Sequence, residues 1–319
     1  MSSWLNGRWE RRHLSHQWSK TRVMEREGVT EGPGSGTPGE VVVPTPPRRL
    51  SPSGAGTFDQ CPRRWRLRYI DRLPDPPGEA ALAGSFAHRV LELFMQREPE
   101  ERTVEAAKAI ARDEWPDVEA DPNFVALGYD DDQAKQFRWK SWMAIEGLWA
   151  LEDPKSVEVR ATEQDIQVEL GGVPFRGIVD RLEVEGDGLV VTDYKSGRAP
   201  SPRYRRGRLD QVLLYAAAVQ ADTGEMPVRA RLLYLGQRPV GIDVNQTEID
   251  AVVDKLAGTW EAINTACAAD DFEPRTGPLC GWCPYVDRCP EGTAEVEKRQ
   301  AKRDAEAAAL NDRDDRMAG

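Results

Sequence analysis

The feature that most constrains the fold is the stretch from Gly177 to Gly197, GIVDRLEVEGDGLVVTDYKSG. Apolar and polar residues alternate in two runs, Ile178–Glu185 and Leu189–Lys195, with a Gly-Asp-Gly sequence between them. Asp-Gly between such runs is a strong hairpin signal, because a type I′ turn needs a positive φ at both central residues. The stretch therefore predicts two antiparallel strands joined by a tight turn.

The register of this predicted hairpin decides which side chains share a face. With Asp-Gly as a two-residue turn, Asp180 pairs with Lys195, and Leu182 pairs with Asp193. Because side chains alternate with period two, one face is predicted to consist of Ile178, Asp180, Leu182, Val184, Leu189, Val191, Asp193 and Lys195. The opposite face is predicted to consist of Val179, Arg181, Glu183, Glu185, Val190, Thr192 and Tyr194. A three-residue turn would instead set Asp180 against Tyr194, and a bulge would be needed to restore the site.

The first face is apolar except at the end where two carboxylates and an ammonium group meet. Two carboxylates on a half-buried face repel each other unless a cation lies between them. A divalent ion held by Asp180 and Asp193 would generate hydroxide and offset charge on a phosphodiester, while Lys195 orients the water or stabilises the transition state. The alternative is a structural Asp–Lys pair at the end of a sheet with an unrelated aspartate nearby. The hairpin alone does not decide between the two.

Composition limits the class of protein and its compartment. The 319 residues are 39% hydrophobic and 30% charged, no window approaches the roughly 20 apolar residues of a membrane span, and no apolar signal segment stands near the N-terminus. We therefore expect a cytoplasmic protein with no membrane partner, whose cysteines are metal ligands or free thiols rather than disulfides. The net charge of −11 argues against a general nucleic-acid coat protein but allows an enzyme with a local basic track.

Three segments are expected along the chain. Residues 1–47 include long Gly/Pro/Ser/Thr-rich runs and are predicted to be a disordered extension. The basic, Trp-rich start of this segment is either a DNA-contacting arm or an upstream extension of the reading frame, with Met24 as the true start. Residues 48–291 are predicted to form the folded domain, and residues 292–319 a charged, Ala-rich tail that is a solvated helix or disordered.

The folded segment begins with helical patterns and continues with strands. The first predicted helix is capped by Ser51 or Ser53 and carries on one face Phe58, Cys61, Trp65 and Tyr69. A second covers GSFAHRVLELFMQ, with inward Phe86, Val90, Leu91 and Phe94. Further helical patterns span 103–115 and 132–151, and the three tryptophans of the latter are expected in the core rather than stacked on bases. From residue 157 a strand, the hairpin, a helix, two strands and a helix predict an α/β fold with a mixed sheet flanked by helices.

A second candidate site consists of cysteines. PLCGWCPYVDRCP places Cys280, Cys283 and Cys289 in a C-x2-C-x5-C pattern, which indicates a metal or cluster site that lacks one ligand. Cys61 is the natural fourth ligand, whereas Cys267 lies in an Ala-rich helix and is predicted to be a small buried residue. Zinc usually takes two paired knuckles, so the one-plus-three distribution favours a [4Fe–4S] cluster. Unliganded thiols are the remaining alternative.

Six pieces of the sequence resemble PD-(D/E)XK nucleases of RecB type and stand in that family's order. The pieces are SPSGAGTFDQCPRRWRLRYI, GSFAHRVLE, GIVDR, VTDYKSG, DQVLLYA and LCGWCPYVDRCP. The resemblance covers about Leu50 to Gly292 and is to the branch with a four-cysteine iron–sulfur staple, which includes the AddB nuclease domain and CRISPR-associated RecB-like exonucleases. It implies a restriction-endonuclease-like fold with a helical N-terminal part and a C-terminal segment stapled by a [4Fe–4S] cluster on Cys61, Cys280, Cys283 and Cys289.

The resemblance also implies the metal site. Asp180 and Asp193 match the family's metal carboxylates, and His88 in GSFAH matches its active-site histidine, which assists metal binding. The Tyr194 carbonyl is a further expected ligand for Mg²⁺ or Mn²⁺. The family's additional acidic residue on the first strand has no unambiguous match; Glu163 is one candidate and is left out of the predicted set.

The same resemblance implies catalytic residues beside the metal. Lys195 matches the catalytic lysine of D-x-K, and Gln211 and Tyr215 match Q-x3-Y. Their i, i+4 spacing puts Gln211 and Tyr215 on one helix face, where they would position the lysine or the DNA. Taken alone, His88 is read as a structural residue, and Gln211 and Tyr215 as ordinary helix surface and core.

Arginines near both constellations are the candidates for DNA contact. Arg203, Arg205 and Arg206 follow the Lys195 strand directly, and Arg63 and Arg64 follow Cys61. Arginine side chains make phosphate contacts that position a nucleic acid. The alternative is a solvated loop.

These patterns predict a Mg²⁺- or Mn²⁺-dependent deoxyribonuclease, an exonuclease on DNA ends or single strands. The expected setting is DNA repair or recombination, phage DNA metabolism or CRISPR adaptation. The sequence contains no G-x4-GK[ST] phosphate loop, so any unwinding would come from a helicase partner. Two alternatives stay open: a non-catalytic protein that keeps the fold to bind DNA or a partner, and a metal-dependent hydrolase of a small phosphorylated substrate.

Overall fold

The computed structural model describes residues 44–318, and for residues 308–318 it describes the backbone alone. The prediction of a disordered extension over 1–47, like the question of Met24, therefore falls almost entirely outside the described residues. Within them, no helix is long and apolar enough to cross a membrane.

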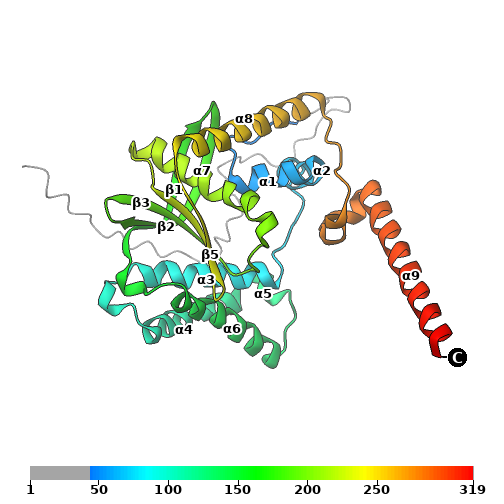
Figure 1. Cartoon of the computed structure of the whole chain (residues 1–319), viewed down its shortest axis with the longest axis horizontal. Helices are drawn as coiled ribbons and strands as arrows, with labels where there is room; N and C mark the ends of the chain where they lie inside the picture. The colour runs from blue at the N-terminus through cyan, green and yellow to red at the C-terminus, as the bar shows by residue number, and fades with distance from the viewer. Residues whose placement is uncertain (1–43, 319) are drawn as a thin grey trace, which may run out of the picture.

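A five-stranded mixed sheet forms the centre of the fold (Figure 1). Its strands are β1 (Glu158–Leu170), β2 (Val173–Glu185), β3 (Gly188–Lys195), β4 (Arg229–Tyr234) and β5 (Arg238–Asp243), and they lie in sequence order. β3 and β4 are parallel and every other neighbouring pair is antiparallel. Parallel neighbours need a long crossover, and the helix α7 (Arg206–Thr223) supplies it. The predicted mixed sheet with flanking helices is confirmed.

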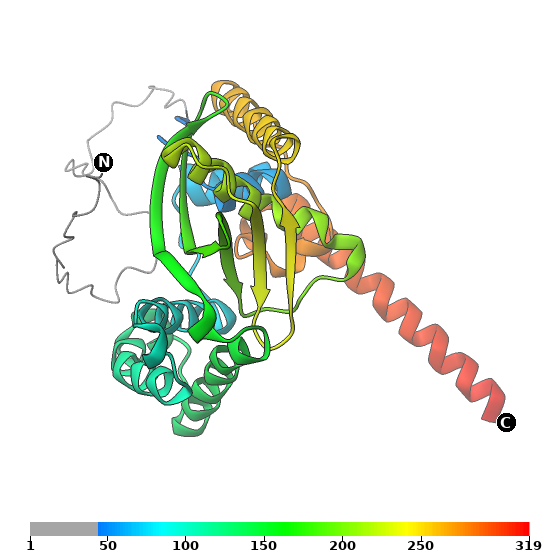
Figure 2. The same ribbon diagram turned by 60° about the vertical axis from the view of Figure 1, so that its left-hand side comes forward.

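Helices cover the sheet in two groups, each with its own hydrophobic cluster. The first group comprises α1 (Pro52–Gln60), α7 and α8 (Gln246–Ala269), packed on β1 to β5. The second comprises α3 (Glu79–Met95), α4 (Val104–Ala120), α5 (Pro122–Val125) and α6 (Asp131–Glu146), and it meets the sheet at Tyr194, Leu233 and Leu235. Figure 2 shows the second group gathered at one end of the strands. The end of β3 therefore lies where the two groups meet.

The expected first helix is interrupted, which corrects the prediction of one continuous helix through Tyr69. Ser51 caps α1 by accepting the Gly54 N–H over 3.1 Å, as expected. Cys61 is extended, with φ −163° and ψ 111°, and ends α1. The cause is Pro62, because a proline ring disfavours the helical conformation in the residue before it. The chain resumes as α2 (Pro62–Trp65) and a π-helical turn, Arg66–Ile70.

The hairpin has a register different from the predicted one. Val184 pairs with Leu189 and Arg181 with Thr192, so the turn residues are Gly186 and Asp187 rather than Asp187 and Gly188. Gly186 supplies the left-handed backbone, with φ 61°. The shift is by two residues, and an even shift leaves each side chain on its predicted face.

Burial of the hairpin residues agrees with the predicted faces except at one position. Leu182, Leu189 and Val191 pack in the cluster below α7, and Tyr194 packs in the cluster of α3 to α6. Val179, predicted on the Tyr194 face, packs in the same cluster as Leu182. The alternation along β2 thus breaks between Val179 and Leu182, beside the irregular backbone of Glu163 on β1, whose φ is 50°.

Most of the expected helix interiors are confirmed, with one exception on α6. Phe86, Val90, Leu91 and Phe94 are all buried. Of the three tryptophans expected in the core, Trp142 and Trp149 pack against the helical cluster. Trp139 is 63% exposed, so the prediction is wrong there. Phe137, Ser141 and Ile145 occupy the buried side of α6, and Trp139 is not part of that stripe.

The remaining elements are short, apart from the last helix. The short turns of helix are Pro99–Glu101, Gly147–Ala150, Pro154–Ser156, Pro202–Tyr204, Pro278–Trp282 and Val286–Arg288. The helix α9 (Pro290–Ala318) includes the charged tail and projects away from the body in both views (Figures 1 and 2). The Gly236 N–H donates to the Gly147 carbonyl over 3.1 Å and so joins the helical group to the β4–β5 turn. A Cβ on Gly147 would lie 2.3 Å from the Gly236 nitrogen, so this close approach requires glycine.

Candidate active site

Two buried carboxylates lie on adjacent strands, one in the middle of β2 and one near the end of β3. Asp180 on β2 is 5% exposed and Asp193 on β3 is 2% exposed. The backbone N–H of Tyr194 donates to Asp180 Oδ2 over 2.8 Å. Buried carboxylates are costly unless they are paired or coordinate a cation, so the partners of each define what the site can do.

His88 reaches the first carboxylate from the helical group. Its Nδ1 lies 3.3 Å from Asp180 Oδ2, and its Nε2 lies 2.9 Å from the Tyr194 carbonyl oxygen. One turn earlier on α3, a Cβ on Gly84 would come within 3.1 Å of Ser196 Oγ, so the helix runs close to the end of β3. The structure therefore brings together three of the four predicted metal ligands: His88, Asp180 and the Tyr194 carbonyl.

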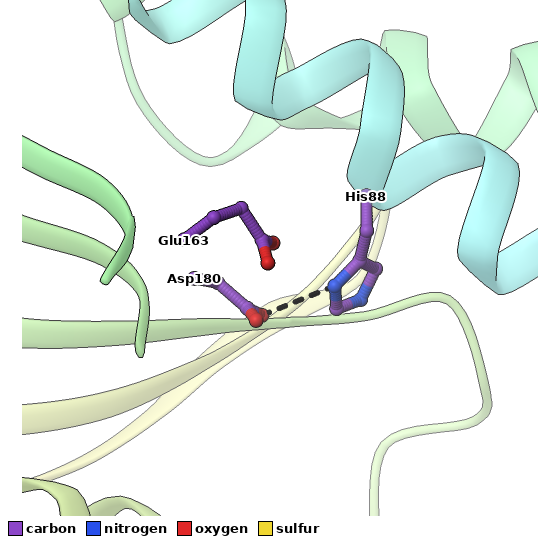
Figure 3. A group of neighbouring side chains, drawn as sticks. All are labelled: His88, Glu163 and Asp180. Atoms are coloured by element: carbon purple, nitrogen blue, oxygen red, sulfur yellow. Dashed lines mark ion pairs between the residues drawn. The ribbon is translucent and has the colours of Figure 1, made fainter. Parts of the chain in front are cut away.

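Glu163 on β1 completes this group and was not in the predicted set. One ligand atom from each of His88, Glu163 and Asp180 lies within 4.8 Å of the others, and Figure 3 shows the three side chains turned toward a common point. Glu163 has φ 50°, a conformation rare for residues other than glycine and often found at functional sites. No local signal singles it out, since β1 carries four acidic residues, Glu158, Glu163, Asp165 and Glu169.

The second carboxylate is held by the predicted catalytic residues. Lys195 Nζ lies 2.6 Å from Asp193 Oδ2 and donates to Gln211 Oε1 over 3.0 Å. Gln211 Nε2 is 3.1 Å from Asp193 Oδ1 and 3.0 Å from the Tyr215 hydroxyl. Asp193, Lys195, Gln211 and Tyr215 thus form one connected network between β3 and α7. A Cβ on Gly177 would lie 2.9 Å from the Tyr215 ring, so glycine is needed for Tyr215 to pack against β2.

The pKa values of the two carboxylates are shifted in opposite directions. Burial alone would raise the pKa of Asp180, but the His88 ring, the Tyr194 N–H and Lys195 outweigh it and lower that pKa. Burial and the nearby Asp180 charge raise the pKa of Asp193 to about 6, although Lys195 opposes them. Burial would lower the pKa of His88, but Asp180 reverses this and raises it. Two acids with opposed shifts in one site are typical of functional carboxylates.

The donor set fits a hard divalent cation. Carboxylates, a backbone carbonyl oxygen and one imidazole are suitable ligands for Mg²⁺ or Mn²⁺. Asp193 Oδ2 is buried and lies 2.6 Å from Lys195 Nζ. A carboxylate oxygen has more than one lone pair, so Asp193 can accept from Lys195 and still coordinate a cation. The residues present are therefore compatible with a metal site.

Comparison with known proteins decides the family. Residues 49–290 match the model of the family described as "PD-(D/E)XK nuclease superfamily", which is most of the chain. The chain belongs to the PD-(D/E)XK nuclease superfamily. Nucleases of this superfamily generally use divalent metal ions, in agreement with the donor set.

Relatives of this superfamily member include two phage proteins, both named "Gene 69 protein". The protein of Mycobacterium phage L5 is 25% identical over 283 residues, which cover 75% of this chain and 95% of the relative. That of Mycobacterium phage D29 is 24% identical over 273 residues, covering 75% and 96%. A crystal structure from Eubacterium rectale, of a protein provisionally named as an exonuclease, has a TM-score of 0.48 and 15% identity, covering 75% of this chain and 88% of that chain. A likeness this distant carries no functional argument.

A buried ionic network lies behind the nuclease site and was not predicted. Arg181, which is fully buried, contacts Glu152 at 2.5 and 2.9 Å and Glu183 at 2.7 Å, and donates to the Tyr194 hydroxyl over 2.9 Å. Arg231 on β4 joins it through Glu152 and Glu183. The network holds the Tyr194 side chain on one face of β3. The backbone N–H and carbonyl of Tyr194 contact Asp180 and His88 in the site. Only the fold brings Glu152 to these strands, so no local signal could have revealed it.

Four of the five cysteines line one cavity. Among the described residues, however, the group of three or more ligand atoms close enough to share one ion is His88, Glu163 and Asp180, and it contains no cysteine, so the predicted cysteine site stays a prediction. Cys61 ends α1, and Cys280, Cys283 and Cys289 come from the segment before α9. The N–H groups of Gly277 and Gly292 lie 3.4 and 3.3 Å from the sulfurs of Cys280 and Cys289. Burial raises the pKa of the Cys283 and Cys289 thiols. The fifth, Cys267, is buried in the core next to α7, which confirms its predicted role.

The arginines predicted to bind DNA fall into two places. Arg63 donates to the Phe272 carbonyl over 3.0 Å, Arg64 donates to Gln60 over 2.9 Å, and both line the cysteine cavity. Arg63 therefore ties the start of α2 to the chain at Phe272, whereas the contact of Arg64 is local. The other three are exposed: Arg203 and Arg205 lie between Lys195 and α7, and Arg206 is the first residue of α7.

Proposed function

We propose that this protein is a Mg²⁺- or Mn²⁺-dependent deoxyribonuclease that acts as an exonuclease on DNA ends or single strands. One observation carries the proposal. Lys195 is held by Asp193 and Gln211, next to a convergent group of His88, Glu163 and Asp180. A structural Asp–Lys pair alone would not require a second group of three ligands turned toward one point.

The residues divide into two roles. His88, Glu163, Asp180, Asp193 and the Tyr194 carbonyl would hold the ion. When bound, the ion would supply a hydroxide nucleophile at neutral pH and offset charge on the phosphate. Lys195 would orient the attacking water or stabilise the charged transition state, and Gln211 with Tyr215 holds its ammonium group in place.

Incubation of end-labelled single- and double-stranded DNA with Mn²⁺, with and without a chelator, tests this proposal. Metal-dependent release of labelled nucleotides is the expected result, and the label at either end reports the polarity. Binding without cleavage would instead favour the non-catalytic alternative. Cleavage of small phosphorylated compounds but not DNA would favour the small-substrate hydrolase, which predicts weak dependence of binding on salt.

The relatives support one biological setting over the others. Both are mycobacteriophage proteins that match over nearly their whole length. Among DNA repair or recombination, phage DNA metabolism and CRISPR adaptation, we therefore favour phage DNA metabolism. A helicase or recombination partner acting upstream of the nuclease is part of this proposal, and a pull-down on tagged protein from infected cells tests it.

We further propose that the cysteine cavity holds a [4Fe–4S] cluster. Four thiols around one cavity, with backbone N–H groups directed at two sulfurs, suit thiolate ligation of a cluster. When bound, the cluster would tie α1 to the segment before α9 across more than 200 residues of chain. Zinc is the alternative occupant, and metal analysis of the purified protein distinguishes the two.

A further inference from the structure

The segment that joins β3 to α7 has a charge pattern unlike the rest of the chain. Residues 196–209, SGRAPSPRYRRGRL, contain five arginines and no acidic residue, in a chain of net charge −11. Arg206 pairs with Glu248, whereas no ion pair with a described side chain, residues 44–307, is formed by Arg198, Arg203, Arg205 or Arg208. Three arginines on the sheet strands differ: Arg160, Arg176 and Arg229 each pair with a carboxylate. The segment is therefore a local source of uncompensated positive charge.

Both ends of this segment are fixed to catalytic candidates. It starts directly after Lys195 and leads into the helix that carries Gln211. The β4–β5 turn holds its first half in place: Gln237 donates to the Gly197 carbonyl over 2.9 Å and accepts the Ala199 N–H over 2.9 Å. Its position relative to the site is thus set by hydrogen bonds.

A hollow of about 520 Å³ lies between the segment and the β4–β5 turn. Its lining residues are Arg198, Ala199, Pro200, Ser201, Gln237 and Arg238. Arg238 donates to the Pro200 carbonyl, which leaves further guanidinium N–H groups of Arg238 available, and Arg198 lines the same hollow. Two guanidinium groups at one hollow match the charge and donor geometry of a phosphate.

Tyr204 stands at the far end of the same segment and is 64% exposed. The guanidinium carbon of Arg203 lies 5.8 Å from the centre of its ring, so the ring is flanked by positive charge. An exposed aromatic ring among cationic side chains is the arrangement on which unpaired bases stack. Bases in a duplex already stack on their neighbours, and taking one out of the stack costs free energy.

We propose that this surface, from Arg198 to Arg208 together with Arg238, holds the single strand of DNA that enters the active site. Arg198 and Arg238 contact a backbone phosphate at the hollow, and Tyr204 stacks on an unpaired base. The inference rests on the proposed nuclease function and narrows it, because it assigns single-stranded DNA as the preferred ligand. The acidic total charge of the chain makes this local surface the entry point.

Binding of a fluorescent single-stranded oligodeoxynucleotide and of its matched duplex tests the base contact. The full chain carrying Lys195→Ala is used without added metal, so that no cleavage occurs. We expect Tyr204→Ala in that background to weaken single-strand binding roughly tenfold and to leave duplex binding unchanged, whereas Tyr204→Phe keeps the ring and the affinity. Trp139→Ala, which removes an equally exposed aromatic on α6, is the matched control and should change neither. Equal weakening on both DNAs, or no weakening by Tyr204→Ala, would overturn the stacking role.

The salt dependence of the same binding tests the phosphate contact. Removal of one phosphate contact should make the slope of log affinity against log salt shallower by about 0.7 for a single strand. Arg198→Ala combined with Arg238→Ala should therefore show a shallower slope, and Arg160→Ala, at an arginine paired with Glu225, should not. An unchanged slope in the double variant would refute the role of the hollow.

Cleavage by the wild-type protein is measured separately, so the two proposals fail in different ways. Protein that binds single strands through these residues but cuts no DNA would refute the nuclease and keep the strand surface. Protein that cuts DNA while every surface variant binds normally would refute the strand surface alone.

Discussion

The backbone N–H of Tyr194 donates a hydrogen bond to the side chain of Asp180 over 2.8 Å. Regular pairing between β2 and β3 ends at Arg181 and Thr192, so a carboxylate continues the contact where the ladder stops. As a result Tyr194 is fixed twice, by its N–H on Asp180 and by its hydroxyl, which accepts a hydrogen bond from Arg181. Its carbonyl oxygen then lies at the site, 2.9 Å from His88 Nε2.

Loss of the Lys195 ammonium group should abolish catalysis without unfolding the protein. Lys195 is partly exposed and contributes its charge to the site rather than to the core. We expect Lys195→Ala to lower Mn²⁺-dependent DNA degradation by about 10²- to 10³-fold, the range seen when one transition-state contact is removed. Lys255→Ala, at a lysine paired with Asp210 on the surface, is the matched control in the same gel assay. Equal activity of the Lys195 variant and wild type would remove the catalytic assignment.

Gln211 is a positioning residue, since it acts through Lys195 and Asp193. Gln211→Ala should therefore reduce kcat by roughly tenfold or more, with a smaller change in KM, because the lysine is misplaced rather than removed. Tyr215→Phe removes the hydroxyl within 3.0 Å of Gln211 Nε2 and should have a weaker effect in the same direction. Steady-state kinetics on single-stranded DNA separates the two parameters. A pure KM effect would indicate that Gln211 contacts DNA instead.

Asp193 should make the metal-free protein less stable as the pH rises. Its pKa is raised to about 6 in the folded protein, by burial and by Asp180, whereas it is about 3.9 in an unfolded chain. The folded state therefore holds a proton that the unfolded state has released between these values, and stability from this group is lost as pH rises through about 6. Relative to Asp193→Asn, the free energy of unfolding in chelator should fall by about 2 kcal/mol between about pH 4 and pH 7. A pH-independent difference would show that Asp193 titrates normally.

If the cysteine cavity binds an iron–sulfur cluster, the purified protein should be coloured and contain iron. Anaerobically purified protein should be brown, and Cys280→Ala should bleach it and lower its Tm, because the substitution removes a cluster ligand and with it the staple. Cys267→Ala changes a buried cysteine outside the cavity and should keep the colour. Iron and zinc analysis with absorption spectra gives the measurement. A colourless preparation with stoichiometric zinc would refute the cluster and leave a structural zinc site.

Breaking the ionic network behind Tyr194 should cost more stability than breaking an exposed ion pair. Glu152→Gln leaves the fully buried Arg181 without one of its two carboxylate partners, and removing one member of a buried pair typically costs about 3 to 5 kcal/mol. Asp165→Asn breaks the exposed contact with Arg176 and should cost less than about 1 kcal/mol. Urea denaturation of the two variants provides the comparison. Equal effects would mean that the buried network contributes little.

Much of this architecture follows from local patterns. Alternation in Ile178–Glu185 and Leu189–Lys195 was enough to predict the hairpin, although the turn residues were misplaced by one position. It did not predict the break in alternation along β2 between Val179 and Leu182, which turns Asp180 to His88 while Asp193 contacts Gln211. The spacing of Gln211 and Tyr215 predicted that they share a helix face, and they are hydrogen-bonded to each other. Periodicity is a local property of the backbone, so it can be read from neighbouring residues.

Contacts between distant segments were decided by the tertiary structure alone. Glu163 could not be chosen among the acidic residues of its strand, because an irregular backbone turns it toward His88. The place of Arg63 beside the cysteines depends on its contact with Phe272, more than 200 residues away. Sequence by itself determined the elements and the chemical types of the site residues, because both depend on short-range spacing. Packing decided which of those residues meet, because burial in a shared core joins segments that no local pattern relates.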